Sequence, residues 1–305
     1  MSAGVTISPE SDASADGRPV GPVRRARVAG AVVRRLHRLP GSVALSIGLL
    51  AVVLVLVVLA PLLQSAATAQ DLLLGTTPAG TPGHLFGTDD LGRDVLRLSL
   101  AGTRSAVLGP VAIAIGSMLA GIVAGMVAGY LGGFWDTVIS RSTDLVLAMP
   151  PILMAIVVGG IVGGGYWVTV GVLVVLFAPS DIRMIRAAVL QARNQPYIEA
   201  TKVLGLPAWR VMSRHLLPNV MPVVMTNVFL NVAFAIVAMS SLSYLGLGVS
   251  PGAADWGRQL ADGRSLLYLN PATAVVPGLL IIVVATATNL VGDWLADRLG
   301  VRSVA

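Results

Sequence analysis

Long apolar runs separated by short polar segments are the dominant pattern of this chain. In a helix, about 20 apolar residues cover the roughly 30 Å of a bilayer's hydrocarbon core. Lipid offers the backbone no hydrogen-bond partners, and a helix satisfies its own. The pattern therefore predicts an all-α membrane protein with six transmembrane helices, at about residues 43–63, 105–130, 140–161, 166–185, 222–241 and 273–291.

The composition agrees with a membrane domain and argues against other classes. Hydrophobic residues make up 55% of the chain and charged residues 12%, about half the charged share of soluble domains. The formal net charge of +6 could indicate nucleic acid, but the arginines lie in loops between apolar runs, where they set membrane topology. We therefore expect no nucleic-acid partner. The absence of cysteine excludes disulfides and thiolate metal sites.

The basic residues also predict how the spans are oriented. Residues 1–40 are rich in arginine and lack periodicity, which predicts a disordered cytoplasmic tail. Residues 41–305 then form one transmembrane domain, in which alternation places residues 64–104 outside, residues 190–218 inside and both termini in the cytoplasm. A signal peptide cleaved near Ala67-Thr68-Ala69 is the alternative for the first run. The long segment before it and the later spans disfavour that alternative.

Two further patterns have structural interpretations. Gly121, Gly125 and Gly129 repeat every four residues in the second span, which predicts a face for close helix packing. Three carboxylates lie close together between His84 and Asp94 and could bind a cation. Arginines interleaved with them are poor neighbours for an oxygen-ligand site. A turn ordered by salt bridges is therefore the preferred interpretation of that segment.

The basic loop at about residues 190–218 has a structure of its own. A first short helix can start at Pro196 and stop at Gly205, and a second covers about residues 208–216. Val203 and Leu204 then contribute to an apolar face. Such a face indicates a protein partner, whereas an ordinary basic loop would place its helices on anionic lipid. The spacing alone leaves both interpretations open.

The order of residues in this loop resembles the coupling motif of ATP-binding-cassette importer permeases. That motif reads E-A-A, three residues, G, nine residues, I-x-L-P. The positions that match it are Glu199, Ala200, Gly205, Leu217 and Pro218. Thr201 stands in place of the second alanine and His215 in place of isoleucine. Thr201 is still small, so the motif is expected to keep its role.

The similarity extends over nearly the whole chain from about residue 40. It is most specific for the dipeptide/oligopeptide permease group, in particular its C-type subunit. It implies the type I importer permease fold, in the cytoplasmic membrane of a bacterium. The ordered matches are His84–Asp94, Gly102–Ser105, Tyr130–Gly133, Arg141–Asp144, Arg193, Tyr197, Arg214–Asn219, Ser243–Gly248, Asp255–Gly257 and Asn289–Asp293.

The resemblance also implies a site and a set of partners. A separate ATPase, which binds the ATP and magnesium, docks on the loop. Glu199 takes the position of the helix residue that rests in the ATPase groove, and Ala200, Thr201 and Gly205 form the close-packed surface. The other implied partners are a second homologous permease subunit, membrane lipid and an external solute-binding protein that delivers a peptide. Importers of nickel chelates or other small solutes in the same family are the alternative. Asp255–Gly257 either contacts the binding protein or substrate, or packs as an outside loop.

The chain lacks the G-x-x-x-x-G-K-[ST] pattern that cradles phosphates. We therefore expect no cofactor in this chain, and ATP hydrolysis in a partner, so that the chain itself is not an enzyme. A secondary transporter driven by an ion gradient is the alternative from a different class. Such proteins place ionisable groups inside the membrane, whereas Asp144, Asp181 and Asp293 lie near the ends of the predicted spans.

Candidate pathway-lining residues lie in the fifth span. They are Met225, Asn227, Asn231 and Met239. Helix packing explains the same residues nearly as well, so the sequence leaves both interpretations open.

Overall fold

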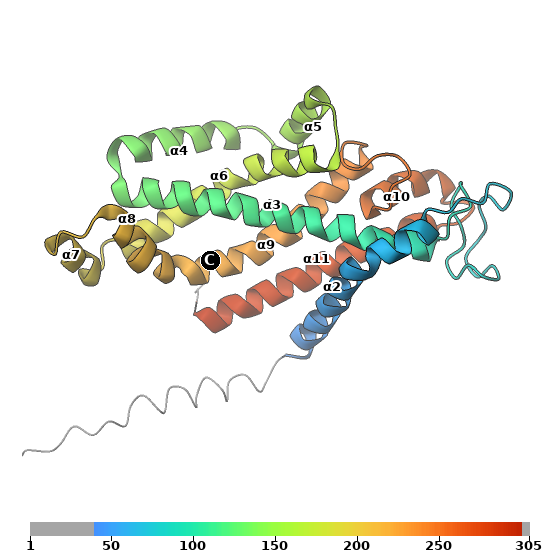
Figure 1. Ribbon diagram of the computed structural model, residues 1–305, viewed down its shortest axis with the longest axis horizontal. Coiled ribbons are helices and arrows are strands. Elements are labelled where there is room, and N and C mark those ends of the chain that lie inside the picture. The colour runs from blue at the N-terminus through green and yellow to red at the C-terminus, as the bar shows by residue number, and fades with distance from the viewer. Residues whose placement is uncertain (1–39, 301–305) are drawn as a thin grey trace, which may run out of the picture. The chain divides into compact units, whose positions relative to one another are not determined.

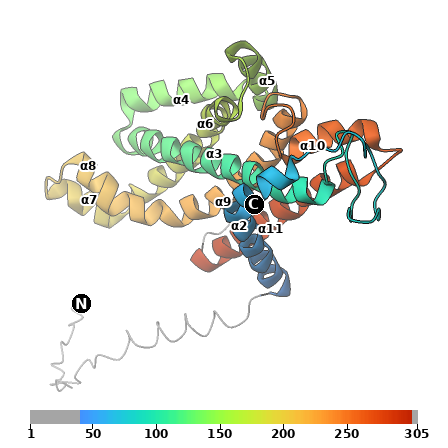
Figure 2. The same cartoon turned by 45° about the vertical axis from the view of Figure 1, so that its right-hand side comes forward.

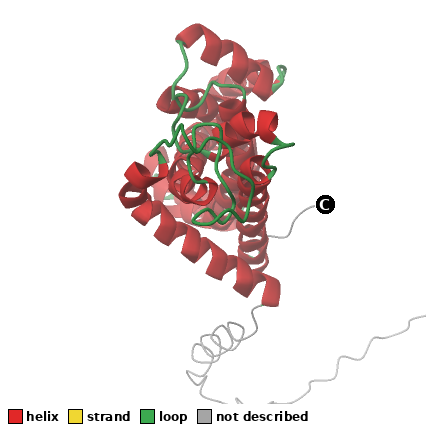
Figure 3. Ribbon diagram, turned by 90° about the vertical axis from the view of Figure 1, so that its right-hand side faces the viewer, coloured by secondary structure: helices red, strands yellow, loops and turns green. Residues whose placement is uncertain are grey.

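The computed structural model describes residues 40–300. Within that range Figure 3 shows helices and loops and no strand. The prediction of an all-α protein is therefore confirmed for the described residues. Residues 1–39 and 301–305 lie outside them, and so does nearly all of the predicted cytoplasmic tail.

Five helices in the described range are each long and apolar enough to cross a membrane. Many of their large apolar side chains are exposed on the chain by itself, as expected for surfaces that face lipid or another membrane protein. In Figure 1 they lie side by side as a bundle. They are α2 (Gly41–Ala67), α3 (Val95–Leu131), α6 (Tyr166–Ala192), α9 (Leu217–Tyr244) and α11 (Ala272–Leu299).

Helix α3 starts ten residues before the predicted span because a cap stabilises an earlier start. Asp94 precedes the helix in an extended conformation, and its Oδ1 accepts a hydrogen bond of 2.9 Å from the backbone N–H of Arg97. Such a cap satisfies one of the first amides, which have no partner inside the helix. The 37 residues of α3 exceed the roughly 20 that cross the hydrocarbon core.

The third predicted span is not one straight helix. It consists of α4 (Gly133–Leu147) and α5 (Pro151–Val162), which meet at an angle of 86°. Pro150 has an extended backbone with ψ of 122°, because a residue that precedes a proline is driven out of the helical region. Pro151 then starts α5 at a position that tolerates proline. Pro150 and Pro151 thus divide the third predicted span, residues 140–161, into two helices.

Helices α3 and α6 run parallel and pack closely through glycines. A Cβ atom at Gly109 would lie 2.7 Å from Tyr166 Oη, and one at Gly129 would lie 2.8 Å from Val189 Cγ1. The contacts thus advance in the same direction along both helices, which makes the helices parallel.

Between the end of α3 and the start of the parallel helix α6, the chain has to run back to the other end of the bundle. Helices α4 and α5 connect the two. This arrangement supports counting the bent pair as one of six crossings.

The two ends of the bundle differ. At one end lie the short helices α7 (Pro196–Val203) and α8 (Ala208–Val211), and we call this the α7 end. At the other lie the loop of residues 68–94 and the short helix α10 (Trp256–Gly263), and we call this the loop end. Figure 2 shows the same separation from a second direction.

Candidate functional site

Helix α7 and the helix that follows it form a compact hairpin at the α7 end. Helix α7 ends in a left-handed turn at Gly205, whose φ is +68°. The N–H of Leu206 donates to the carbonyl of Thr201 at 3.1 Å, and the N–H of Gly205 donates to that of Lys202 at 3.0 Å. This pair of bonds is the Schellman arrangement, which favours glycine at the left-handed position. Pro207 then prevents α7 from continuing.

One face of the hairpin is anchored to the bundle. Ile198 of α7 and Val211 of α8 have no exposed surface. They belong to one hydrophobic cluster with Val189 of α6 and Val220 of α9. Burying a side chain of this size contributes about 1.5–3 kcal/mol, so a displacement of α7 is expected to move α6 and α9 as well.

The opposite face of the hairpin is exposed, and much of it is apolar. Val203 is 88% exposed, Leu204 76% and Trp209 63%, while Glu199 and Ala200 are also exposed. We call these five residues the docking face. A soluble surface rarely concentrates apolar side chains in this way without a partner.

Thr201 lies on the anchored face instead. Its side chain is buried, and its Oγ1 donates a hydrogen bond of 2.6 Å to the carbonyl of Ile198. The two residues are three positions apart and so share one side of the helix. Thr201, predicted as part of the close-packed surface with Ala200 and Gly205, is therefore not on the exposed face of this chain by itself, whereas Gly205 is exposed at the edge of that face.

The second part of the hairpin continues directly into the membrane helix. Residues Ala208–Tyr244 form one helical path of 37 residues. It contains a π-helical segment, Met212–Leu216, directly before Leu217 and Pro218. In a regular α-helix the ring of Pro218 would clash with the carbonyl four residues earlier, and a wider π turn is a common adjustment within such a helix. The short helix predicted over about residues 208–216 and the fifth span therefore follow one another without a break.

A polar cluster that the sequence did not predict lies inside the bundle. Asp181 of α6 is 1% exposed and accepts hydrogen bonds from the amide groups of two residues of α9. Asn227 Nδ2 donates to Oδ1 at 2.8 Å, and Asn231 Nδ2 donates to Oδ1 at 2.8 Å and to Oδ2 at 2.9 Å. Helix α6 extends beyond the predicted span to Ala192, and Asp181 lies within its length.

The four candidate pathway residues do not share one surface. Asn227 and Asn231 face Asp181, whereas Met239 is 1% exposed within an apolar cluster. Met225 is 46% exposed. In this chain by itself Met239 therefore belongs to the core, because the apolar neighbours cover it.

At the α7 end two arginines bind the two sides of the turn between α3 and α4. Arg186 lies in α6, and Arg193 is the C-cap of the same helix. Arg186 binds both carboxylate oxygens of Asp136, with Nη2 to Oδ2 at 2.8 Å. Arg193 Nη1 donates to the carbonyl of Gly129 at 2.9 Å. Paired contacts of a guanidinium with one carboxylate fix geometry as well as charge. Helix α4 is thereby tied to the helix that leads into α7.

The loop end is ordered by a buried ion pair and further polar contacts, as the sequence indicated. Arg93 Nε contacts Asp89 Oδ2 at 2.6 Å, with both side chains less than 10% exposed, and Arg93 Nη1 donates to the carbonyl of Gly252 at 3.1 Å. His84 Nδ1 lies 2.8 Å from Asp94 Oδ2. Within residues 40–300 no group of three or more His, Asp or Glu residues is arranged to hold a metal ion.

The Asp255–Gly257 segment is also packed into the loop end. Trp256 is 1% exposed, and its Nε1 donates to the carbonyl of Ser99 at 2.8 Å. Asp255 caps α10 by accepting from the N–H of Arg258 at 3.1 Å. Burial raises the pKa of the Asp255 carboxyl above its ordinary value. Of the two interpretations of this segment, the structure shows the packed loop.

Comparison with known proteins agrees with the membrane-spanning fold. Residues 121–301 match the family described as binding-protein-dependent transport system inner membrane component. A Brucella suis protein that carries the name of a peptide permease is 34% identical over 259 residues, which cover 81% of this chain and 86% of that protein. The glutathione transport system permease protein of Escherichia coli is 36% identical over 217 residues, covering 71% of each.

Two further similarities extend this picture. The dipeptide transport system permease protein of Haemophilus influenzae is 32% identical over 220 residues, covering 72% of this chain and 75% of that protein. A chain of the methionine ATP-binding-cassette transporter MetNI, in an inward-facing conformation, superposes with a TM-score of 0.50 at 20% identity, covering 67% of this chain and 97% of that one. The second similarity concerns the fold alone. This chain belongs to the family of binding-protein-dependent transport system inner membrane components, and it is a multi-pass protein of the cytoplasmic membrane.

Proposed function

We propose that this chain is a permease subunit of an ATP-driven importer that carries peptides across the cytoplasmic membrane. The observation that carries the proposal is the docking face, an exposed and largely apolar surface on a hairpin whose other face is anchored in the bundle. Family membership and the peptide, dipeptide and glutathione names of its relatives support the same assignment. Glutathione is itself a tripeptide, so these names agree on substrate chemistry.

The proposed mechanism transmits motion from a partner ATPase into the membrane. The ATPase binds ATP and magnesium and contacts the docking face, with Glu199 at the start of α7. Ile198 passes the displacement to the cluster it shares with α6 and α9. The helical path Ala208–Tyr244 carries it along α9. Asp181, through its bonds to Asn227 and Asn231, keeps α6 and α9 together as they move.

The other partners follow from the same proposal. A second homologous permease subunit covers exposed apolar faces of the bundle and completes the pathway. An external solute-binding protein delivers the peptide at the loop end, which lies opposite the docking face. Import of nickel chelates or another small solute remains the alternative within the family.

The buried carboxylate of Asp181 is the one observation that favours ion-gradient-driven transport instead, because carboxylates inside the membrane often bind protons or cations. Here each of its oxygens already accepts an amide hydrogen bond. Uptake by this chain alone in liposomes, driven by a proton gradient without ATP, would support that alternative.

The docking face is tested in the assembled complex. Glu199→Lys and Val203→Asp should each reduce co-purification of the ATPase and substrate-stimulated ATP hydrolysis by at least tenfold, since both side chains are exposed and their replacement leaves the bundle intact. Leu73→Asp is the matched control for co-purification of the ATPase, because Leu73 is fully exposed in the loop of residues 68–94, away from the docking face. Wild-type ATPase binding and transport in both docking-face variants would exclude the proposed coupling role.

A further inference from the structure

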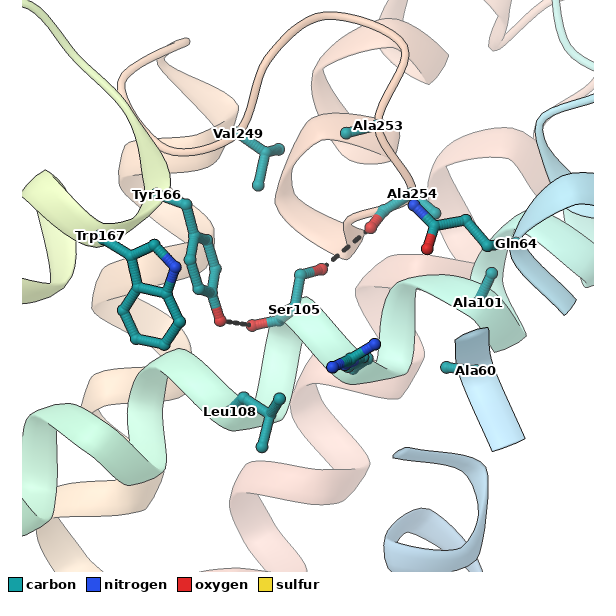
Figure 4. Close-up of a pocket in the computed structure, with 11 residues that line it drawn as sticks. Ala60, Gln64, Ala101, Ser105, Leu108, Tyr166, Trp167, Val249, Ala253 and Ala254 are labelled. Carbon is teal, nitrogen blue, oxygen red and sulfur yellow. Dashed lines mark hydrogen bonds between the residues drawn. The ribbon is translucent and has the colours of Figure 1, made fainter. Parts of the chain in front are cut away.

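A pocket at the loop end contains an arginine that the coupling mechanism does not use. Its volume is about 300 Å³, at the lower end of the range for small-molecule sites, about 300–1,000 Å³. Helices α2, α3 and α6 and the segment after α9 surround it, as Figure 4 shows. The side chains used below are Gln64 of α2, Arg104 and Ser105 of α3, and Tyr166 and Trp167 of α6.

Arg104 brings a positive charge to this pocket without a neighbouring carboxylate. No Asp or Glu among residues 40–300 lies within 4.0 Å of its guanidinium group. The nearby carboxylate of Asp255 already accepts a hydrogen bond from the N–H of Arg258 at 3.1 Å, and its Oδ2 lies 3.0 Å from Ser105 Oγ. The apolar stretch of α3 starts just after Arg104. Arg104 is exposed on the chain by itself, so its guanidinium group is open to an anion.

The walls of the pocket are held in place by hydrogen bonds. Tyr166 Oη donates to the carbonyl of Ser105 at 2.7 Å, and Ser105 Oγ donates to the carbonyl of Ala254 at 2.9 Å, as drawn in Figure 4. Tyr166 and Trp167 pack edge to face with ring centroids 5.1 Å apart. Trp167 is 67% exposed, so its ring remains open to an incoming side chain. A site on fixed helices keeps its geometry during binding.

We propose that this pocket receives the carboxylate end of the transported peptide, with Arg104 as the residue that binds the carboxylate. A guanidinium group presents two parallel N–H donors that match the two oxygens of a carboxylate. The amide of Gln64 and the ring of Trp167 then contact the last residue of the peptide. The pocket lies opposite the docking face, where a binding protein would release its peptide, so this inference rests on the proposed function.

The test compares two forms of one peptide in liposomes that contain the complete transporter and its binding protein. One form has a free terminal carboxylate and the other a terminal amide, with otherwise uncharged side chains. Arg104→Gln should lower the initial uptake rate of the free acid about tenfold relative to wild type, which corresponds to about 1.4 kcal/mol. It should change uptake of the amide less than twofold. Because one binding protein delivers both forms, its own preference cancels in the ratio of variant to wild type.

Controls separate this role from structural and lipid effects. Arg97→Gln should leave both rates unchanged, because Arg97 is exposed on the same helix but outside the pocket. Arg104→Lys should retain part of the preference for the free acid. Equal loss of both peptides, or no loss of either, would overturn the inference. So would a loss that scales with the anionic lipid content, since Arg104 would then bind lipid phosphate. Absence of ATP-dependent uptake by the wild type would instead contradict the proposed function itself.

Discussion

At the scale of single residues, Asp181 shows how a carboxylate inside a helix bundle obtains its hydrogen-bond donors. Two asparagines of α9, one helical turn apart, direct their amide groups at it. Polar contacts between membrane helices are individually modest, about 0.6 kcal/mol on average. Loss of one partner costs more than the contact itself, because the remaining groups stay buried without a partner.

Substitution of Asp181 alone should therefore be worse than removal of the whole cluster. Asp181→Leu should lower the free energy of unfolding by about 1–3 kcal/mol, since both amides lose their acceptor. The triple variant with Asn227→Leu and Asn231→Leu should recover most of that loss. Thermal unfolding of the purified protein in detergent measures both. A triple variant less stable than the single one would contradict this argument. It would show that the three side chains stabilise the fold by more than providing one another with hydrogen-bond partners.

Roles that depend on residues close together in the sequence could be predicted, whereas roles that depend on contacts between distant segments could not. The match of Glu199, Ala200 and Gly205 to the coupling motif is local, so the sequence alone displays it. The inward position of Thr201 follows from α7 packing on other helices, which the motif does not encode. Asp181 and its partners lie 46 residues or more apart, and only the register of α6 against α9 brings them together.

At the scale of elements, close packing of α3 on α6 requires glycine. A Cβ atom at Gly125 would lie 2.8 Å from Ile185 Cβ and 2.9 Å from the carbonyl oxygen of Ile182. The second neighbour is backbone and cannot move by a rotamer change. The glycine repeat predicted as a packing face is thus a packing face in the structure.

The same substitution should have opposite effects at two glycines of this helix pair. Gly125→Ala should destabilise the protein by about 1–3 kcal/mol through overpacking. Gly171→Ala in α6 should be neutral or stabilising by up to about 1 kcal/mol, because nothing lies within 4 Å of its added methyl group and alanine favours helix. Unfolding in detergent compares the two. Equal destabilisation would contradict the packing argument.

The turn after α7 gives a second prediction for an element. Gly205→Ala should cost about 1 kcal/mol because its φ is positive, whereas Gly205→Asn should cost less. No atom lies within 4 Å of an added Cβ, so the cost is conformational only. Hydrogen exchange of the last amides of α7 should accelerate in the order Gly205→Asn, Gly205→Ala, Gly205→Val. If Gly205→Val exchanged as slowly as wild type, the left-handed turn would not control the end of α7.

Helix existence was easier to predict than helix ends. Apolar runs of about 20 residues identify the spans, because their length matches the bilayer. The ends depend on contacts beyond the run, such as the Asp94 cap of α3. The bend between α4 and α5 follows from Pro150 and Pro151, which the sequence displays, but its angle depends on packing.

At the scale of the whole molecule, the number of crossings depends on α4 and α5. Since α3 and α6 run parallel, the bent pair should cross the membrane despite its angle of 86°. The family and its type I importer fold could be predicted from ordered motifs along the chain. The pocket around Arg104 could not, because four segments far apart in the sequence build it.

The absence of native cysteine permits a direct test of this topology. Phe134→Cys and Leu204→Cys should react with a membrane-impermeant maleimide only from the cytoplasmic side. Trp167→Cys and Leu73→Cys should react only from the external side. All four side chains are exposed in the chain. Reaction of Phe134→Cys and Trp167→Cys from one side would show that α4 and α5 re-enter without crossing.

The contacts of Gly121, Gly125 and Gly129 in α3 with Asp181, Ile185 and Val189 in α6 repeat every four residues on both helices. A slide of one helix past the other by one turn, about 5.4 Å, would again set glycines against side chains and leave much of the apolar packing intact. We therefore expect the apolar contacts of this interface to allow more than one alignment. Two hydrogen bonds join α3 to α6 and its C-cap, from Tyr166 to the carbonyl of Ser105 and from Arg193 to the carbonyl of Gly129, and they exist in one of these alignments only. The scarce polar groups of this bundle therefore determine which alignment is adopted, while its abundant apolar groups determine that the helices associate.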